Sequence, residues 1–182
     1  MLERRESYRQ LYDEFRWSIP ETFNIGVAIS NAWALRAPER IALFEHRGSA
    51  SPATLTYGDL AARSDGLAAG LAKAGIRRGE RVALLLPQSF ETAIAHAAIY
   101  KLGAIAVPLA LLFGPEALEY RLFSAGAAAV ITTGDGLAKV ARIRDRLPAL
   151  QLAICVDGAG GGAEDFHKLI ADNPGPFAPA ST

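Results

Sequence analysis

The chain has 182 residues, which is enough for one domain with a hydrophobic core. Its 19 Lys and Arg residues balance 19 Asp and Glu residues, so no net positive charge attracts nucleic acid or anionic lipid. No apolar run approaches the roughly 18 residues of a membrane span, and the charged amino-terminal segment is unlike a signal or transit peptide. We therefore expect a soluble, cytoplasmic protein with no nucleic-acid partner and no membrane span.

Two short helices are expected at the start of the chain. The first is amphipathic, ends before Pro20, and is expected to pack on the body of the protein. Its apolar face consists of Tyr8, Leu11, Tyr12 and Phe15. The second begins after Asn24, which can act as an N-cap, and ends before Pro38. Its apolar stripe, expected to face the core, consists of Ile25, Ala28, Ile29, Ala32 and Trp33.

Strands and helices then alternate along the chain. "RIALFEH" and "ATLTY" predict an antiparallel hairpin, joined by the turn-rich "RGSASP". Thr56 and Asp59 have the spacing of a capping box, and the helix that they begin is expected to end at Gly75. Further strands are predicted at 82–86, 104–108, 127–132 and 152–156, and further helices at 89–102, 115–125 and 137–147.

These four later strands are apolar on both faces and are separated by helical patterns of about ten or more residues. This arrangement is typical of a parallel sheet that is covered by helices on both sides. The sequence thus predicts an α/β fold: a mostly parallel sheet with helices on both faces, an amino-terminal helical segment and a small antiparallel hairpin. Ligands of such sheets bind at the carboxyl ends of the strands. Any site is therefore expected in the loops "PQS", "PLALLFGP", "TTGDG" and "DGAGGGAED".

Two glycine-containing turns invite comparison with nucleotide-binding motifs. "GAGGGA" at 158–163 fits the dinucleotide fingerprint, but the long helix and the further strand that this unit requires do not follow it, so a flexible surface loop is favoured. "ITTGDGLAK" at 131–139 lacks the full spacing of a P-loop, and an ordinary strand-to-helix turn is favoured.

The remaining reactive side chains form no complete catalytic constellation. The three histidines, His46, His96 and His167, are far apart in the sequence, and none has a second ligand at metal spacing. Cys155 is the single cysteine and lies in an apolar run, where a buried and inert thiol is expected. We therefore expect no catalytic residue and no metal ligand among these side chains.

The ordered segments resemble a known family. "FRWSIPETFNIGVAISNAWA", the long stretch from "LTYGDLAARSDG" to "KLGAIAVPL", "LFGPEALEYRLFSAGAAAVIT" and "GLAKVARIRDRLPAL" are similar to the amino-terminal region of the adenylate-forming acyl-CoA synthetases. These are AMP-forming acid:CoA ligases of the acetate and medium-chain type. The resemblance covers nearly the whole chain and runs in unbroken order.

The resemblance implies that this chain is the amino-terminal part of a longer ligase. Such an enzyme forms acyl-CoA from a carboxylic acid, ATP and CoA through an acyl-adenylate, with Mg²⁺ as a further cofactor. The family's phosphate loop, and with it the catalytic residues, would follow residue 182, so the 182-residue piece alone is expected to be inactive. Residues 1–172 would form the amino-terminal α/β subdomain, and residues 173–182 a linker or frayed tail toward the missing phosphate loop.

The resemblance also implies where CoA could be contacted. In similar synthetases the loop before "PEALEYR" and the next strand-end turn lie near CoA, which makes Phe113, Gly114, Lys139 and Arg142 the candidate CoA-binding residues. Lys139 and Arg142 are expected to contact the 3′-phosphate of CoA. The chain departs from the family at Ala138 and Ala141, where cations would be expected.

Two alternatives remain open at this stage: a small nucleotide- or flavin-binding oxidoreductase that uses the glycine turns, and a noncatalytic α/β binding module.

The carboxylic acid is not identified by the sequence. Ala110, Leu111 and Leu112 make the nearby surface apolar, which is compatible with an aliphatic acid and a role in fatty acid metabolism. Some self-association is expected, because a piece without its downstream neighbour exposes apolar surface.

Overall fold

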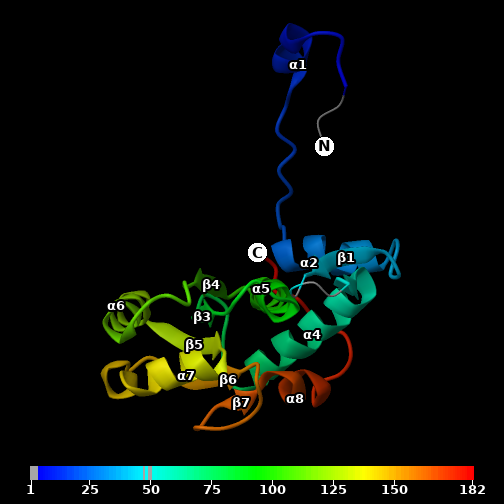
Figure 1. Ribbon diagram of the computed structural model, residues 1–182. Helices are drawn as coiled ribbons and strands as arrows, with labels where there is room; N and C mark the ends of the chain where they lie inside the picture. Colours follow the sequence, from blue (N-terminus) through cyan, green and yellow to red (C-terminus); the bar gives the residue numbers. More distant parts are fainter. Residues whose placement is uncertain (1–3, 47, 49–50) are drawn as a thin grey trace.

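The computed structural model describes residues 4–46, 48 and 51–182. Its body is a five-stranded sheet with helices on both faces, accompanied by a separate two-stranded sheet (Figure 1). The helices are α1 (Tyr8–Glu14), α2 (Ile25–Ile29), α3 (Asn31–Ala34), α4 (Tyr57–Lys73), α5 (Phe90–Leu102), α6 (Pro115–Ala125), α7 (Gly134–Ala141), the 3₁₀ helix η1 (Arg144–Arg146) and α8 (Phe166–Ala171). The strands are β1 (Ile41–Glu45), β2 (Ala53–Thr56), β3 (Arg81–Leu85), β4 (Ile105–Pro108), β5 (Ala127–Thr132), β6 (Leu152–Cys155) and β7 (Glu164–Asp165). The predicted α/β class is confirmed.

The main sheet has the strand order β4-β3-β5-β6-β7, and all its neighbouring pairs are parallel. The central strands β3 and β5 are almost entirely buried. The expectation that all four predicted strands are buried on both faces is wrong for β4, which lies at the edge of the sheet and leaves Ile105 50% exposed. The hairpin of β1 and β2 is antiparallel as predicted, and residues 47, 49 and 50 of its turn lie outside the described residues.

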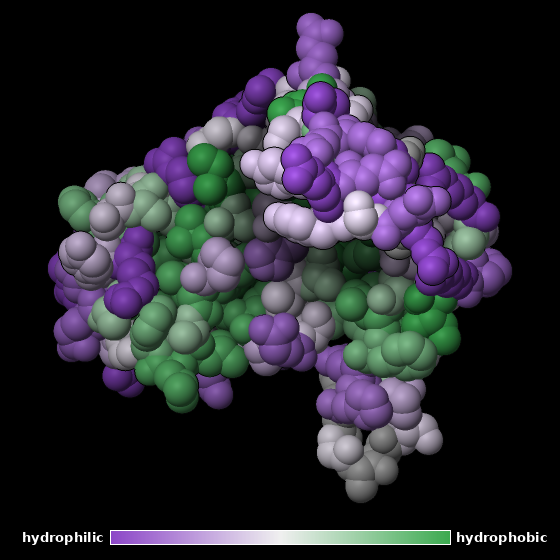
Figure 2. All heavy atoms as spheres, turned by 90° about the horizontal axis from the view of Figure 1, so that it is seen from above, coloured by the Kyte–Doolittle hydropathy of each residue, from purple (hydrophilic) through white to green (hydrophobic). Residues whose placement is uncertain are grey.

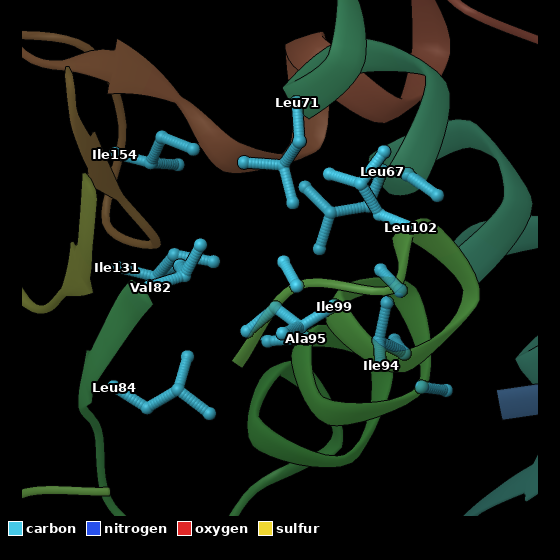
Figure 3. Packing of buried hydrophobic residues seen from close by; sticks show 14 of the residues in the cluster. Leu67, Leu71, Val82, Leu84, Ile94, Ala95, Ile99, Leu102, Ile131 and Ile154 are labelled. Atoms are coloured by element: carbon cyan, nitrogen blue, oxygen red, sulfur yellow. The ribbon is translucent and has the colours of Figure 1, made fainter. Parts of the chain in front are cut away.

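Two hydrophobic clusters cover the two faces of the sheet. The larger one joins α4, α5 and α8 to one face, and Figure 3 shows side chains of α4, α5 and the strands that point toward one another, among them Leu67, Ile99 and Val82. The smaller one joins α6 and α7 to the other face through Leu118, Leu122 and Val140. No helix in the described part of the chain is both long enough and apolar enough to cross a membrane.

Local sequence signals explain most helix ends. The side chain of Thr56 accepts from the backbone N–H of Asp59, whose carboxylate accepts in return, so the predicted capping box begins α4. Gly103 takes the left-handed conformation that ends α5 as predicted. The predicted helix 137–147 is shifted toward the amino terminus. Thr133 is its N-cap, so the helix begins at Gly134, three residues before the predicted start, and it ends at Ala141.

Two expectations about the amino-terminal helices are wrong. Helix α1 does not pack on the body: none of its residues is buried, Tyr8 is 80% exposed, and Figure 1 shows α1 at the end of an extended stretch away from the sheet. In α2 the expected core stripe points the other way, since Ile25 is 50% exposed while Gly26 is buried against α5. A helix that buries its glycine side can approach its neighbour more closely than one that buries its isoleucines.

The last residues form no helix or strand, yet they lie against the fold. Ala180 N–H donates to the Lys101 carbonyl at 2.8 Å, and Phe177 packs against the larger hydrophobic cluster. Helix α8 precedes this segment, with Phe166 fully buried and Leu169 beside Gly70 of α4. The carboxyl terminus therefore ends beside α2, near the start of the fold (Figure 1).

Candidate functional site

The carboxyl ends of the central strands open into a cleft beside the hairpin. Two adjoining cavities of about 420 and 460 Å³ share the residues Glu45, His46, Gln88 and Ser89. The second is also lined by Thr133 after β5, by Val156 and Asp157 after β6, and by Glu91 and His167. Three of the four loops that the sequence predicted, "PQS", "TTGDG" and "DGAGGGAED", therefore meet at one edge of the sheet.

The cleft is polar, and its acidic groups already have partners. Asp157 accepts from the backbone N–H of Gly134 at 2.7 Å. Glu91 lies 3.9 Å from His167; although burial disfavours its ionised form, hydrogen bonds from Ser89 and from its own backbone N–H bring the pKa of Glu91 below its usual value. On the far wall, burial lowers the pKa of His96. Within the described ranges, no group of three or more His, Cys, Asp or Glu side chains is arranged to hold a metal ion.

The fourth predicted loop lies apart from this cleft. Because β4 is the edge strand on the other side of β3, the loop "PLALLFGP" helps to line a separate cavity of about 590 Å³. This cavity is mostly apolar and also contains Tyr120 and Arg121 of α6. The guanidinium of Arg121 lies over the ring of Phe113, 4.1 Å from its centroid.

Three of the four candidate CoA-binding residues lie together at this loop. Lys139 Nζ donates to the carbonyl oxygens of Leu111 at 2.6 Å and Phe113 at 3.3 Å, which ties α7 to the loop. Gly114 caps the amino end of α6. Since an ammonium group has three donors, one donor of Lys139 remains for a ligand.

Arg142 lies one turn further along α7 and is exposed. In the described part of the chain its side chain makes no hydrogen bond and no ion pair, so its guanidinium is available. Arg121 was not among the sequence-predicted site residues. No spacing rule pointed to it, because its contact with Phe113 depends on how α6 folds back over the loop.

The glycine-rich loop "GAGGGA" is exposed at the surface over residues 159–162. It is followed by the two-residue strand β7 and the six-residue helix α8. A dinucleotide-binding unit instead needs its glycine turn to open a long helix that leads to a further strand. The geometry therefore does not support the oxidoreductase alternative. Cys155 is buried, as expected of an inert core thiol.

Comparison with known proteins identifies the family. Residues 31–179 match the family described as AMP-binding enzyme. The chain belongs to this family. The 4-coumarate–CoA ligase 5 of Oryza sativa subsp. japonica is 36% identical over 111 residues, which are 61% of this chain and 19% of the relative. The acetyl-coenzyme A synthetase of Vibrio vulnificus is 30% identical over 125 residues, which are 68% of this chain and 19% of the relative.

Solved structures with a similar fold include a CoA ligase and an acyl-CoA synthetase. The anthranilate CoA ligase AuaEII, solved in complex with anthranoyl-AMP, superposes with a TM-score of 0.79 at 28% identity, covering 90% of this chain and 30% of that one. The acyl-CoA synthetase of Brucella canis has the same fold, with a TM-score of 0.84 at 24% identity, covering 96% of this chain and 34% of that one. The chain spans only about a fifth of the length of the curated relatives that it matches and about a third of these solved chains.

The described residues do not fit a site for ATP and Mg²⁺. The turn after β3 is "PQSFE", without the glycines that allow a backbone to wrap a phosphate. Among the acidic side chains of the cleft, Asp157 accepts a backbone hydrogen bond and Glu91 lies in an ion pair with His167, so they do not form a cluster for Mg²⁺. The Lys139 loop, by contrast, offers an ammonium donor and an exposed guanidinium. These groups suit an anionic ligand such as a phosphate.

Proposed function

We propose that the chain is the amino-terminal part of an acid:CoA ligase that makes acyl-CoA from a carboxylic acid, ATP and CoA. The observation that supports this proposal is the family match over residues 31–179 together with the named CoA ligases among the relatives. Residues 1–172 are then the amino-terminal α/β subdomain, and residues 173–182 link it to the phosphate-binding region. The enzyme works in the cytoplasm.

The proposed reaction has two steps. The carboxylate of the acid attacks the α-phosphorus of ATP, forming an acyl-adenylate and releasing pyrophosphate; the CoA thiol, losing its proton, then attacks the acyl carbon and AMP leaves. Mg²⁺ would supply charge neutralisation on the phosphates. The residues described here contribute the scaffold and the loop at the end of β4. The groups that act on ATP lie outside this chain, which is why the chain alone has no activity.

Acid-dependent ATP–pyrophosphate exchange tests this proposal. The 182-residue chain is compared with a version extended downstream, using acetate through octanoate and benzoate as acids. Exchange in the longer version alone is the expected result. Exchange with the aliphatic acids would favour a role in fatty acid metabolism, in keeping with the apolar Ala110, Leu111 and Leu112. If neither protein catalyses exchange with any acid, the ligase proposal is wrong.

In the same ligase, Lys139 and Arg142 contact the 3′-phosphate of CoA, and Phe113 and Gly114 shape the adjoining loop. The support is the third donor of Lys139 and the exposed guanidinium of Arg142 one turn away. Because Lys139 also holds the loop carbonyls, its removal changes the loop as well as the charge. Arg142→Ala removes charge alone.

We expect Arg142→Ala to raise KM for CoA about tenfold, since a charge-assisted hydrogen bond contributes on the order of 1.5–3 kcal/mol. The double variant Lys139→Ala/Arg142→Ala should raise it further. ATP–pyrophosphate exchange, which needs no CoA, serves as the control and should stay at the wild-type rate in Arg142→Ala. Unchanged CoA kinetics in the double variant would remove this site assignment.

A further inference from the structure

The carboxyl-terminal residues are held by hydrogen bonds to residues that are far away in the sequence. Phe23 N–H donates to the Thr182 carbonyl at 2.5 Å, and the Thr182 hydroxyl donates to the Phe23 carbonyl at 2.7 Å. Arg78 donates to the Ser181 carbonyl at 2.7 Å. The backbone of residues 180–182 is therefore fixed beside the start of α2 and the end of α5.

Asn24 is the centre of this set, because its side chain forms hydrogen bonds both to α2 and to the carboxyl-terminal segment. Its Oδ1 accepts from the Val27 N–H at 3.1 Å, which caps α2. Its Nδ2 donates to the carbonyls of Tyr100 at 2.9 Å and Lys101 at 3.3 Å, at the end of α5, and to the Ala180 carbonyl at 2.9 Å. An aspartate at this position would keep the cap and lose all three donated bonds.

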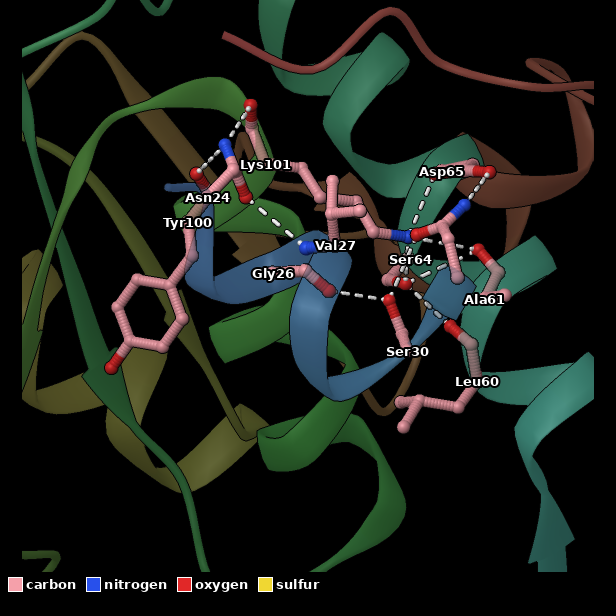
Figure 4. A network of polar contacts seen from close by, with 11 residues as sticks. Asn24, Gly26, Val27, Ser30, Leu60, Ala61, Ser64, Asp65, Tyr100 and Lys101 are labelled. Atoms are coloured by element: carbon pink, nitrogen blue, oxygen red, sulfur yellow. Dashed lines mark hydrogen bonds and ion pairs between the residues drawn. The ribbon is translucent and has the colours of Figure 1, made fainter. Parts of the chain in front are cut away.

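Near Asn24, α5 is joined to α4 by a buried ion pair. Lys101 Nζ lies 2.7 Å from Asp65 Oδ1 and also donates to the Ser64 hydroxyl at 2.7 Å (Figure 4). The other oxygen of Asp65 accepts from Asn31 at 3.1 Å, which connects α4 to α3. Gly26 brings α2 so close to α5 that a Cβ there would stand 2.5 Å from the Ala97 carbonyl oxygen. Residues 180–182 are thus attached where α2, α3, α4 and α5 contact one another.

We propose that Asn24 is a positioning residue: it fixes the place and direction of the backbone of residues 180–182 beside α2. In the ligase proposed above, on which this inference rests, the segment that leaves here leads to the residues that bind the phosphates of ATP. Asn24 touches no substrate. It acts through the backbone of residues 180–182, and displacement of a binding segment by even about 1 Å can lower a rate by roughly a hundredfold.

The first test uses the 182-residue chain itself. Hydrogen exchange is measured for the amides of Val27, Ala180 and Thr182 in the wild type and in Asn24→Asp. We expect at least tenfold faster exchange at Ala180, because the tail loses its side-chain donor, and unchanged exchange at Val27, because the cap remains. The matched control is Asn173→Asp, which removes another amide donor of the same segment, the one to the Leu169 carbonyl at 2.8 Å. It should leave Ala180 as protected as in the wild type.

The second test uses the version extended downstream, with initial rates of acid-dependent ATP–pyrophosphate exchange. Asn24→Asp should raise KM for ATP about tenfold or more, and so lower kcat/KM for ATP, and leave KM for the carboxylic acid unchanged, whereas Asn173→Asp should behave as the wild type. A variant that was merely less stable would lower the amount of active enzyme without changing either KM. If Asn24→Asp does not fold, Asn24→Ser, which keeps a capping oxygen without adding a charge, gives the same readouts.

The outcomes separate the two proposals. Unchanged exchange at Ala180 in Asn24→Asp overturns the anchoring of the tail. A loosened tail with wild-type ATP kinetics overturns the positioning role and leaves the ligase proposal intact. A wild-type extended protein without any exchange activity overturns the ligase proposal and, with it, the role of Asn24 in adenylation, while the anchoring of the tail stands or falls on the hydrogen-exchange result alone.

Discussion

At the scale of single residues, the buried pair of Lys101 and Asp65 has the largest expected effect on stability. Burial lowers the pKa of Lys101, and the nearby Asp65 carboxylate opposes that shift. Removing one partner leaves the other charge buried without compensation, so Lys101→Met should lower the free energy of unfolding by about 3–5 kcal/mol in urea denaturation. The control is Lys168→Met, which breaks an exposed pair with Asp172 at 2.6 Å and should change stability far less. Equal losses in the two variants would contradict this account.

His96 gives the protein a pH-dependent stability. Burial lowers the pKa of His96 from its usual value of 6.5, so near that pH the unfolded chain binds more protons than the folded one. The stabilising contribution is therefore complete above pH 6.5 and is lost as the pH falls through the folded-state pKa. We expect Tm to decrease between pH 7.5 and pH 5.5, and the decrease to be smaller in His96→Gln. The same pH dependence in both proteins would assign the effect to another group.

At the scale of secondary-structure elements, the contact of α2 with α5 depends on Gly26. A Cβ at this position would stand 2.7 Å from the backbone nitrogen of Lys101, and a backbone atom cannot swing aside as the end of a side chain can. Gly26→Ala should therefore destabilise the protein by about 1–3 kcal/mol, although alanine is the better helix former. In Gly134→Ala, at the start of α7, the new methyl group meets only Asp157 Oδ2 at 3.5 Å, and stability should be unchanged or higher. Thermal unfolding of both variants checks the difference.

Most elements could be predicted from the sequence because their signals are local. Thr56, Asp59 and Gly103 act within one helical turn of their own position, and the parallel sheet then determines which loops meet at the cleft. What could not be predicted depends on packing between distant segments. The inverted face of α2 follows from its close approach to α5, and the separation of the β4 loop from the cleft follows from the strand order. The bonds of Lys139 to the loop carbonyls join residues more than twenty positions apart.

At the scale of the whole molecule, apolar side chains remain exposed over the edge strand and the adjoining helix. Figure 2 shows hydrophobic residues gathered on this face, next to polar ones. The largest exposed ones there are Ile105, Leu112, Tyr120 and Phe123. An open sheet edge with apolar neighbours favours association between copies. The sedimentation coefficient of the 182-residue chain should therefore rise with concentration.

A charge on the edge strand should weaken this association. Ile105→Lys is expected to shift the sedimentation coefficient toward that of a monomer, since lysine on an edge strand disfavours pairing with a second copy. Leu35→Lys serves as the control, because Leu35 is exposed at the end of α3, a helix that contacts α2 and α4. A wild-type chain that sediments as a monomer at every concentration would contradict the prediction.

The bond between Asn24 and Ala180 also bears on the order of folding. It joins residues 156 positions apart, and such a contact forms only after the intervening chain has been brought together. The entropic cost of closing a loop grows only logarithmically with its length, so the extra cost of this long loop is small once the sheet has formed. The helices and the central strands can therefore assemble first, and the seating of the last three residues completes the native state. Loss of those residues would leave a nearly complete fold whose amino-terminal helix pair lacks its final partner.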